Sequence, residues 1–281
     1  MKISDISAWQ GNIDWNKARK ELDFVIFRAS VGNLKDTRYV EYANNCGVPF
    51  GVYHFFKCGT VLSAELETEF FYKCATQEGL NPLFFVADIE YSTQTKYNTK
   101  EICETILKTL KNLGAKKIGL YIGQEKYAYV KDIINNFDFI WIPRYGKNDG
   151  TPNSQYKPIY PCDLWQYTDK GLLAGVAEKV DLNILNGNKT LEWFTGKISS
   201  MVTVKINNTL RNGSKGKEVK ELQKFLNKLG YNCGIADGIF GTKTTNAVKN
   251  FQKMNNLTID GIFGKKSLAM LKKILAENDA K

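Results

Sequence analysis

Two carboxylates, Asp88 and Glu90, stand at alternate positions directly after the apolar run Phe84–Ala87. A continuous apolar run of this kind predicts a strand buried on both faces, as in parallel sheets. Because side chains alternate along a strand, Asp88 and Glu90 should share one face near its C-terminal end. Active sites of parallel barrels lie at that end, and paired carboxylates there indicate acid–base chemistry. The alternative is a strand end that carries two solvated acids.

Other polar residues recur where further predicted strands end. They are Asp5, His54, Gln166 and Asp181. A barrel of parallel strands would bring such residues together over one mouth, so the set predicts a catalytic site. His54 is the only histidine in the chain. We expect it to have a structural or substrate-contacting role, because the carboxylates already supply the acid and the base.

Short apolar segments that read as strands are spaced along the first two thirds of the chain. The eight segments are Ile3–Ser7, Phe24–Phe27, Phe50–Phe56, Leu83–Ile89, Ile118–Ile122, Phe139–Ile142, Leu164–Tyr167 and Val180–Leu182. Helical patterns lie between several of them, at Tyr39–Cys46, Ser63–Cys74, Thr99–Leu113 and Tyr127–Ile134. This alternation predicts an α/β fold with a (β/α)8-like barrel. The region is shorter than the roughly 250 residues of a typical eightfold barrel. No helix is evident between Tyr145 and Leu164, so we expect an irregular barrel.

The last part of the chain has a different character. Val219, Leu222 and Leu226 form a helical stripe, and the sequence DGIFG then appears twice, at Asp237–Gly241 and Asp260–Gly264, each time before a helical pattern. The repeat predicts a small all-α domain of three helices whose turns require those glycines. Each half should bury an Ile or a Phe against the other.

Composition and charge set further bounds. The 281 residues are 43% apolar and 24% charged, as in ordinary globular proteins, and no stretch is long and apolar enough for a membrane span. Residues 1–198 carry 24 Lys and Arg against 23 Asp and Glu, whereas residues 199–281 carry 15 against 6. Such a basic tail suggests a polyanionic partner or a solubilising surface. The six cysteines form no CxxC pair, so we expect free thiols.

Several other chemistries lack the residues they need. A zinc amidase uses two or more histidine ligands and a cysteine peptidase needs a Cys–His pair, but His54 is the only imidazole available to either. No glycine-rich phosphate loop points to a nucleotide cofactor. We therefore expect neither a metal nor a cofactor. The few aromatic residues of the basic tail are spaced as a core, which disfavours nucleic acid as a partner.

The spaced motifs resemble glycoside hydrolase family 25, the Chalaropsis-type lysozymes. They are Asp5-Ile6-Ser7, Tyr53-His54-Phe55, Asp88-Ile89-Glu90, Trp165-Gln166-Tyr167 and Asp181. The resemblance covers residues 1–192. After a linker at 193–208, residues 209–275 resemble the peptidoglycan-binding module found on wall hydrolases, through the run GSKGKEVKELQ and both DGIFG turns. The resemblance implies hydrolysis of the β-1,4 bond between N-acetylmuramic acid and N-acetylglucosamine.

The resemblance also implies roles for the acidic residues. Glu90 would be the general acid, and Asp88 would support the neighbouring charge and orient the substrate's acetamido group. Asp5 and Asp181 would complete the acidic mouth. The chemistry agrees, since glycoside hydrolysis needs a protonated carboxylic acid beside carboxylates that stabilise an oxocarbenium-like centre. Arg28 keeps a positive charge where the family more commonly has Lys.

Further residues could contact the sugar rings. We expect substrate binding by His54, Tyr53, Tyr121, Trp141, Tyr145, Trp165 and Gln166, although core packing explains each aromatic residue equally well.

A muramidase without an export signal, joined to a wall-binding module, resembles a phage endolysin. We expect it to be made in the host cytoplasm and to reach the wall after holin-type release. The alternatives are a bacterial autolysin of the same chemistry and a non-catalytic wall-binding protein. The expected partner is peptidoglycan of Gram-positive walls, together with anionic wall polymers, and not a membrane. Met201, in the linker, could start a shorter product that consists of the binding module.

Overall fold

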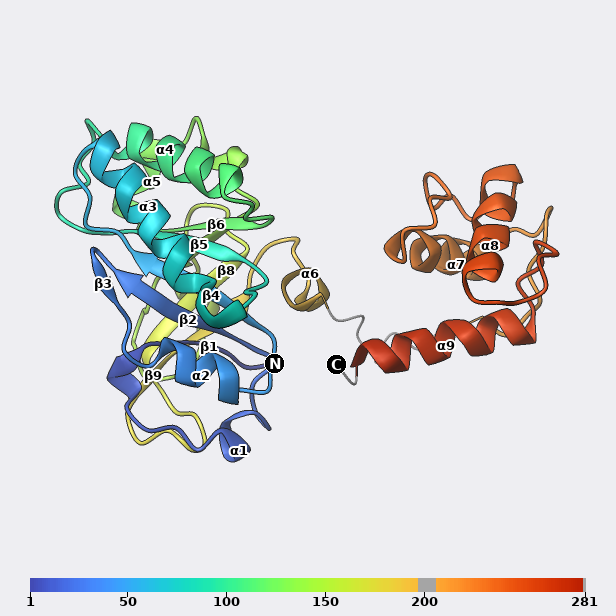
Figure 1. Cartoon of the computed structure of the whole chain (residues 1–281), viewed down its shortest axis with the longest axis horizontal. Coiled ribbons are helices and arrows are strands. Elements are labelled where there is room, and N and C mark those ends of the chain that lie inside the picture. Colours follow the sequence, from blue (N-terminus) through green and yellow to red (C-terminus); the bar gives the residue numbers. More distant parts are fainter. Residues whose placement is uncertain (197–205, 280–281) are drawn as a thin grey trace. The chain divides into compact units, whose positions relative to one another are not determined.

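The computed structural model describes residues 1–196 and 206–279. The chain forms two compact units, Met1–Gly196 and Lys197–Lys281 (Figure 1). Met201 lies outside the described residues. Among the residues described, no helix is both long enough and apolar enough to cross a bilayer.

The first unit is a closed barrel of eight strands. They are β1 (Ile3–Ile6), β2 (Phe24–Val31), β4 (Phe50–Phe55), β5 (Phe85–Ile89), β6 (Ile118–Ile122), β7 (Phe139–Pro143), β8 (Leu164–Gly171) and β9 (Val180–Leu185). Each strand pairs with the next, and β1 pairs with both β9 and β2, which closes the sheet. A two-residue strand, β3 (Leu34–Lys35), extends β2 as a hairpin. The predicted barrel of eight strands is confirmed.

Strand β9 departs from a regular (β/α)8 barrel, because it runs antiparallel to both of its neighbours. The connection from β8 to β9 spans only residues 172–179, and a parallel crossover needs a dozen residues or more. The chain therefore turns back as a hairpin. Asp181 was expected where a strand ends, but it lies near the start of β9, opposite Asp5 in the register.

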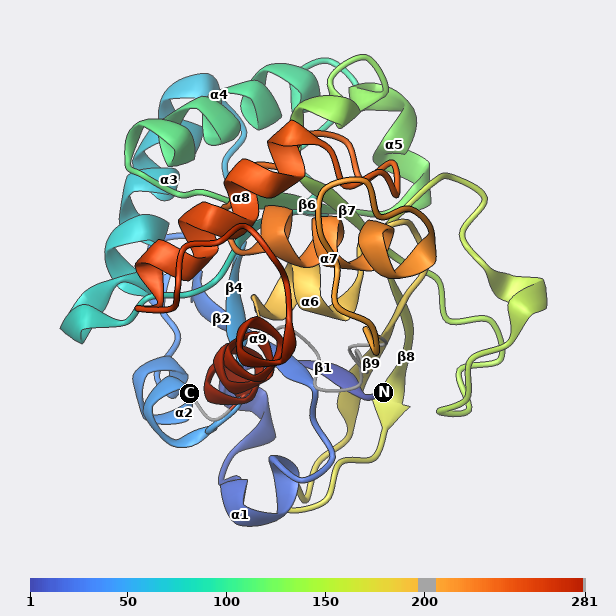
Figure 2. The ribbon, with the colours of Figure 1, turned by 90° about the vertical axis from the view of Figure 1, so that its right-hand side faces the viewer.

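Most helices lie outside the barrel strands (Figures 1 and 2). In this unit they are α1 (Trp15–Ala18), α2 (Tyr39–Asn45), α3 (Val61–Ala75), α4 (Thr99–Asn112), α5 (Gln124–Val130) and α6 (Leu191–Thr195). Helix α4 is the helix predicted at Thr99–Leu113, and its apolar residues Ile102, Ile106 and Leu110 are fully buried. The helix predicted at Tyr127–Ile134 begins three residues earlier, after Gly123, and ends at Val130. As expected, the connection from β7 to β8 contains only a 3₁₀ turn, Ser154–Tyr156.

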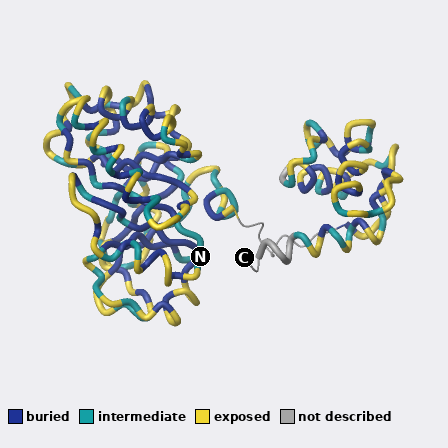
Figure 3. Tube along the Cα trace, in the orientation of Figure 1, coloured by how far each residue is buried: buried dark blue, intermediate teal, exposed yellow. Residues whose placement is uncertain are grey.

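The interior of the barrel changes from aromatic to acidic along its axis. At one end Phe84, Phe139 and Phe194 pack ring against ring, with centroids 5.0–5.5 Å apart. Glycines provide room for these rings: a Cβ at Gly119 would lie 2.2 Å from the Phe139 ring. Most residues of the barrel strands are buried (Figure 3). Because Phe194 is part of this core, the barrel unit continues past residue 192, where its boundary was expected, to Gly196.

The second unit contains the three predicted helices, α7 (Lys217–Lys228), α8 (Thr242–Met254) and α9 (Lys265–Asp279). In both DGIFG turns the Phe is the buried residue, since Phe240 and Phe263 are at most 1% exposed. The preceding isoleucines, Ile239 and Ile262, face solvent and are 49% and 36% exposed. Ile206 packs in the core of this unit, so the expected linker ends before it.

All six cysteines lie within the described residues, and each is a separate buried thiol, as expected from their spacing.

Candidate active site

A pocket of about 250 Å³ opens at the acidic end of the barrel. Each of the eight barrel strands contributes at least one side chain to the pocket, and β4 contributes two. The pocket is lined by Asp5, Arg28, Tyr53, Phe55, Asp88, Glu90, Tyr121, Trp141, Tyr145, Gln166 and Asp181. The structure thus brings all four predicted carboxylates together, with five of the seven predicted substrate-binding residues.

Asp88 and Glu90 share one face at the end of β5, as their spacing predicts, but their surroundings differ. Asp88 is 5% exposed, and its Oδ1 atom has no hydrogen-bond partner among the described residues. Burial, followed by the charge of Glu90, raises the pKa of Asp88 well above its usual value. Glu90 is exposed at the rim. Incomplete hydration raises the pKa of Glu90, and the Lys126 ammonium partly opposes that effect.

Asp5 and Asp181 form a second carboxyl pair. Asp5 is buried and accepts hydrogen bonds from Gln166 Nε2, at 3.0 and 3.1 Å, and from Asn183 Nδ2, at 2.7 Å. Burial raises the pKa of Asp5, and these donors oppose the shift. Burial and then the negative charge of Asp5 raise the pKa of Asp181 to about 9. The two carboxyl groups are coupled and together retain a proton at neutral pH, and the hydrogen bonds that Asp5 accepts favour its ionised form.

Two tyrosines fix the amide that holds Asp5. The hydroxyls of Tyr121 and Tyr145 donate to Gln166 Oε1, at 2.9 and 2.8 Å, which leaves the amide nitrogen of Gln166 to face Asp5. The Trp141 indole donates to Asn183 Oδ1 at 2.7 Å and orients the second donor in the same way. The carboxylate of Asp5 is thus held from both sides by side chains that are themselves hydrogen-bonded, which preorganises the mouth.

Arg28 brings a positive charge into this acidic pocket. Its guanidinium pairs with Asp36 through Nε and Nη2, both at 2.9 Å from Oδ2. The Asp36 side chain is fully buried and also accepts the backbone N–H groups of Ala8 and Arg38, both at 3.0 Å. Two charge-assisted contacts to one oxygen of a buried carboxylate hold the guanidinium in one orientation.

Two predicted substrate-binding residues, His54 and Trp165, lie outside the pocket. Each neighbours an inward-facing residue on its strand and therefore points the other way. His54 contacts Ser30 Oγ at 2.7 Å and Glu67 Oε2 at 3.2 Å, and its ring stacks on Phe71. The indole of Trp165 is 2% exposed and donates to the Arg144 carbonyl. Their predicted contact with substrate has no support from this geometry, and both pack in the wall behind it.

Three residues at the mouth were not predicted from the sequence as site residues. Asn183 lies two positions after Asp181 on β9, so the alternation of side chains was the signal that could have found it. Phe55 likewise follows Tyr53 by two positions on β4. Lys126 comes from α5, and nothing in the local sequence indicates that it lies near Glu90.

Among residues 1–196 and 206–279, no group of three or more His, Cys, Asp and Glu side chains has the arrangement of a metal site.

A closed barrel with four carboxyl groups clustered at its mouth has the groups that a glycoside hydrolase requires. Residues 4–176, more than half of the chain, match glycosyl hydrolases family 25, and the chain belongs to this family. It is a lysozyme, a 1,4-β-N-acetylmuramidase that acts on the peptidoglycan of bacterial cell walls. Residues 215–271 match the peptidoglycan binding domain family.

Individual relatives agree with this assignment. The chain is 26% identical over 276 residues to the autolytic lysozyme of Clostridium acetobutylicum, which covers 94% of this chain and 76% of that protein. The catalytic domain of endolysin ply40, from bacteriophage P40 of Listeria monocytogenes, superposes with a TM-score of 0.64 at 29% identity, covering 70% of this chain and 98% of that one. The CTP1L endolysin gives a TM-score of 0.57 at 25% identity, covering 70% of each chain.

Proposed function

We propose that Glu90 is the general acid of the muramidase reaction. It is the exposed member of the carboxyl cluster, so a glycosidic oxygen bound in the mouth can reach it. Its pKa is raised, which keeps a proton on it at a pH where an ordinary glutamate has lost it. In this role Glu90 gives its proton to the leaving oxygen as the bond from that oxygen to the anomeric carbon breaks.

Asp88 is proposed to bind the acetamido group of the N-acetylmuramic acid ring. The observation that carries this role is its buried Oδ1, which lacks a hydrogen-bond partner among the described residues and belongs to a side chain that lines the pocket. An acetamido N–H would satisfy that oxygen, and the acetamido carbonyl oxygen would then point toward the anomeric carbon. It can form the bond to that carbon while the leaving group departs, and water completes the hydrolysis.

Asp5 and Asp181 would act on the charge of the transition state. Positive charge develops on the sugar ring as the bond breaks. The carboxylate of Asp5, held by Gln166 and Asn183, supplies a fixed negative charge in the same pocket. Such preorganised charge stabilises a transition state without reorganisation during the reaction.

In its biological setting the protein is proposed to be an endolysin that lyses Gram-positive cells at the end of a phage infection. Two of the similar solved structures are endolysins. A bacterial autolysin is the second candidate, favoured by the likeness to the autolytic lysozyme over 94% of this chain. Expression in a Gram-positive host separates them. An endolysin should lyse the culture only when a membrane pore is opened, whereas an autolysin should release wall fragments without one.

A shorter product beginning at Met201 is proposed as well. The CTP1L endolysin is described as regulated by a secondary translation product. A product of residues 201–281 would contain the whole segment that matches the peptidoglycan binding domain. A single full-length band from the native gene, detected with an antibody against the tail, would refute it.

The reaction is tested by digesting purified Gram-positive sacculi with the wild type and with Glu90→Gln, followed by borohydride reduction and mass spectrometry. New muramitol ends from the wild type alone would support a muramidase that depends on Glu90. Glucosaminitol ends would indicate cleavage of the other glycosidic bond. Free stem peptides with intact glycan would overturn the glycosidase mechanism.

A further inference from the structure

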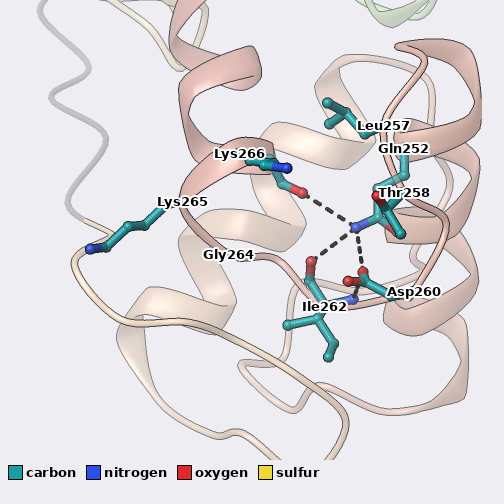
Figure 4. A pocket seen from close by; sticks show the side chains of 9 residues that line it. Gln252, Leu257, Thr258, Asp260, Ile262, Gly264, Lys265 and Lys266 are labelled. Carbon is teal, nitrogen blue, oxygen red and sulfur yellow. Dashed lines mark hydrogen bonds between the residues drawn. The ribbon is translucent and has the colours of Figure 1, made fainter.

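The two DGIFG turns of the helical unit are built around two equivalent glutamines. The Nε2 atom of Gln252 donates to Asp260 Oδ1, Ile262 O and Ser267 Oγ, at 2.8, 2.9 and 3.3 Å (Figure 4). Its Oε1 atom accepts the Gly261 N–H at 2.9 Å. The first copy repeats these bonds with Gln223, Asp237, Gly238, Ile239 and Thr244, at 2.8–3.0 Å. Both turns are therefore held rigidly from within.

The two copies share this hydrogen-bond network, but several of the residues around it differ. Beside the second turn lies a cavity of about 270 Å³, whose lining includes Leu257, Thr258, Asp260, Ile262 and Lys266. Figure 4 shows Thr258 and Asp260 beside the Gln252 amide, with the Lys265 side chain directed away from it. None of the residues that line this cavity is aromatic.

The cavity has an acid and a base that do not pair with each other. Asp260 uses Oδ1 for Gln252 and for the Ile262 N–H. Within the described part of the chain, no hydrogen bond or ion pair is recorded for Asp260 Oδ2 or for the Lys266 ammonium. Both side chains are exposed. One cavity thus offers a negative and a positive group at separate points, together with the Thr258 hydroxyl and the apolar side chains of Leu257 and Ile262.

The first copy differs at positions that border the cavity in the second. Gly234 and Ile235 precede Asp237 at the positions that Leu257 and Thr258 hold before Asp260. A Cβ at Gly234 would lie 3.4 Å from Cδ and 3.8 Å from Nζ of Lys243, so the Lys243 side chain lies next to Gly234. In the second copy the corresponding lysine is Lys266, and Leu257 stands at the position of Gly234. Leu257 and Lys266 both line the cavity, so Leu257 adds an apolar wall that a glycine cannot supply.

We propose that this cavity is the recognition site of the module and that it binds the zwitterionic amino-acid end of a peptidoglycan stem peptide. Lys266 would bind the carboxylate of this amino-acid end, and Asp260 would bind its ammonium group. Ile262 and Leu257 would contact the methylene chain that joins this end to the peptide. This proposal specifies the ligand of the wall-binding module, and it rests on the module's binding to peptidoglycan.

Two other wall components fit the site less well. A polyphosphate chain would meet the carboxylate of Asp260, and like charges in one site disfavour binding. A sugar ring is commonly bound against an aromatic face, and the lining of this cavity has none.

The test uses the full chain with Glu90→Gln, so that no substrate is cut, labelled with ¹⁵N. Two soluble probes are compared: the tripeptide L-Ala-γ-D-Glu-meso-diaminopimelate, and the same tripeptide with its distal amine acetylated. We expect the free tripeptide to shift the amide signals of residues 260–267, and the acetylated one to bind much more weakly. Asp260→Asn and Lys266→Gln should each weaken binding by about tenfold, the loss typical of one charge-assisted hydrogen bond.

The first copy provides matched controls. Asp237→Asn and Lys243→Gln make the same chemical changes in an equivalent turn and should leave binding of the tripeptide unchanged. Equal binding of both probes, or equal weakening by the control variants, would overturn the assignment. Retention of Glu90→Gln on sacculi is measured in parallel. If sacculi stripped of teichoic acids retain the protein while the tripeptide does not bind, the cavity is wrongly assigned but wall binding stands. If retention requires teichoic acids, the ligand is the polyanion.

Discussion

Asp5 and Asp181 face each other directly across the antiparallel pair of β1 and β9. Parallel strands alone would not produce this arrangement, because Asp181 lies near the start of its strand. The reversal of β9 places two carboxyl groups at the mouth where they share one proton, since burial and the charge of Asp5 raise the pKa of Asp181 to about 9.

This pair makes the barrel less stable as the pH rises. The folded state holds a proton on Asp181 that the unfolded chain, with a pKa near 3.8, releases. The stabilisation from this proton is complete below pH 3.8 and is lost as the pH rises toward 9. Asp181→Asn removes the titration, so its Tm should fall less than that of the wild type between pH 5 and 8. Each kcal/mol corresponds to about 2–4 °C in Tm for a domain of this size. Parallel Tm curves for the two proteins, measured by calorimetry, would contradict the shared proton.

Glu90→Gln should lower kcat by about 10²–10⁴-fold, the usual contribution of a general acid, without unfolding the barrel. Glu90 is exposed and its side chain makes no contact on which the core depends. The measurement is release of reducing ends from soluble muropeptides, with circular dichroism to check the fold. Glu125→Gln, which removes a neighbouring charge, is the control and should keep activity close to that of the wild type.

The charges beside Glu90 should move the alkaline limb of the pH–rate profile in opposite directions. Lys126 lowers the pKa of Glu90 and Glu125 raises it. Lys126→Met should therefore shift the limb to higher pH and Glu125→Gln to lower pH. Interactions of about 0.5–1 kcal/mol between partly exposed charges correspond to roughly half a pH unit in each case. The profile of kcat/KM against pH gives both values. Shifts of the same sign would mean that another group controls this limb.

His54→Ala should affect stability and not substrate binding. The change removes the ring from between Phe56 and Phe71 and leaves the Ser30 hydroxyl without its buried partner. We expect a loss of about 2–4 kcal/mol in the free energy of unfolding. Urea denaturation measures this loss. KM for muropeptides should stay within about twofold of the wild-type value, because His54 lies outside the pocket and no contact with substrate is removed. Tyr53→Ala, at the preceding position inside the pocket, is the contrasting variant and should raise KM.

Much of the mouth could be predicted because it depends on alternation within a strand. Asp88 and Glu90 share a face for that reason, and the buried run before them identified the strand. The same rule separates Tyr53 from His54, but the sequence alone does not say which of two adjacent residues points inward. The position of Asp181 at the mouth depends on the direction of β9. That direction follows from the short connection between β8 and β9. The position of Lys126 beside Glu90 depends on how α5 packs, and no local pattern encodes it.

The state of the six thiols has a consequence for the environments in which the fold persists. Oxidation proceeds through the thiolate, and burial raises the pKa of Cys58 to about 12 and that of Cys162 to about 11. All six sulfurs are buried, and none joins another. The barrel and the helical unit therefore gain nothing from an oxidant and lose nothing to a reductant. The same covalent structure serves in a reducing compartment and in an oxidising one, and transfer between them requires no chemical maturation.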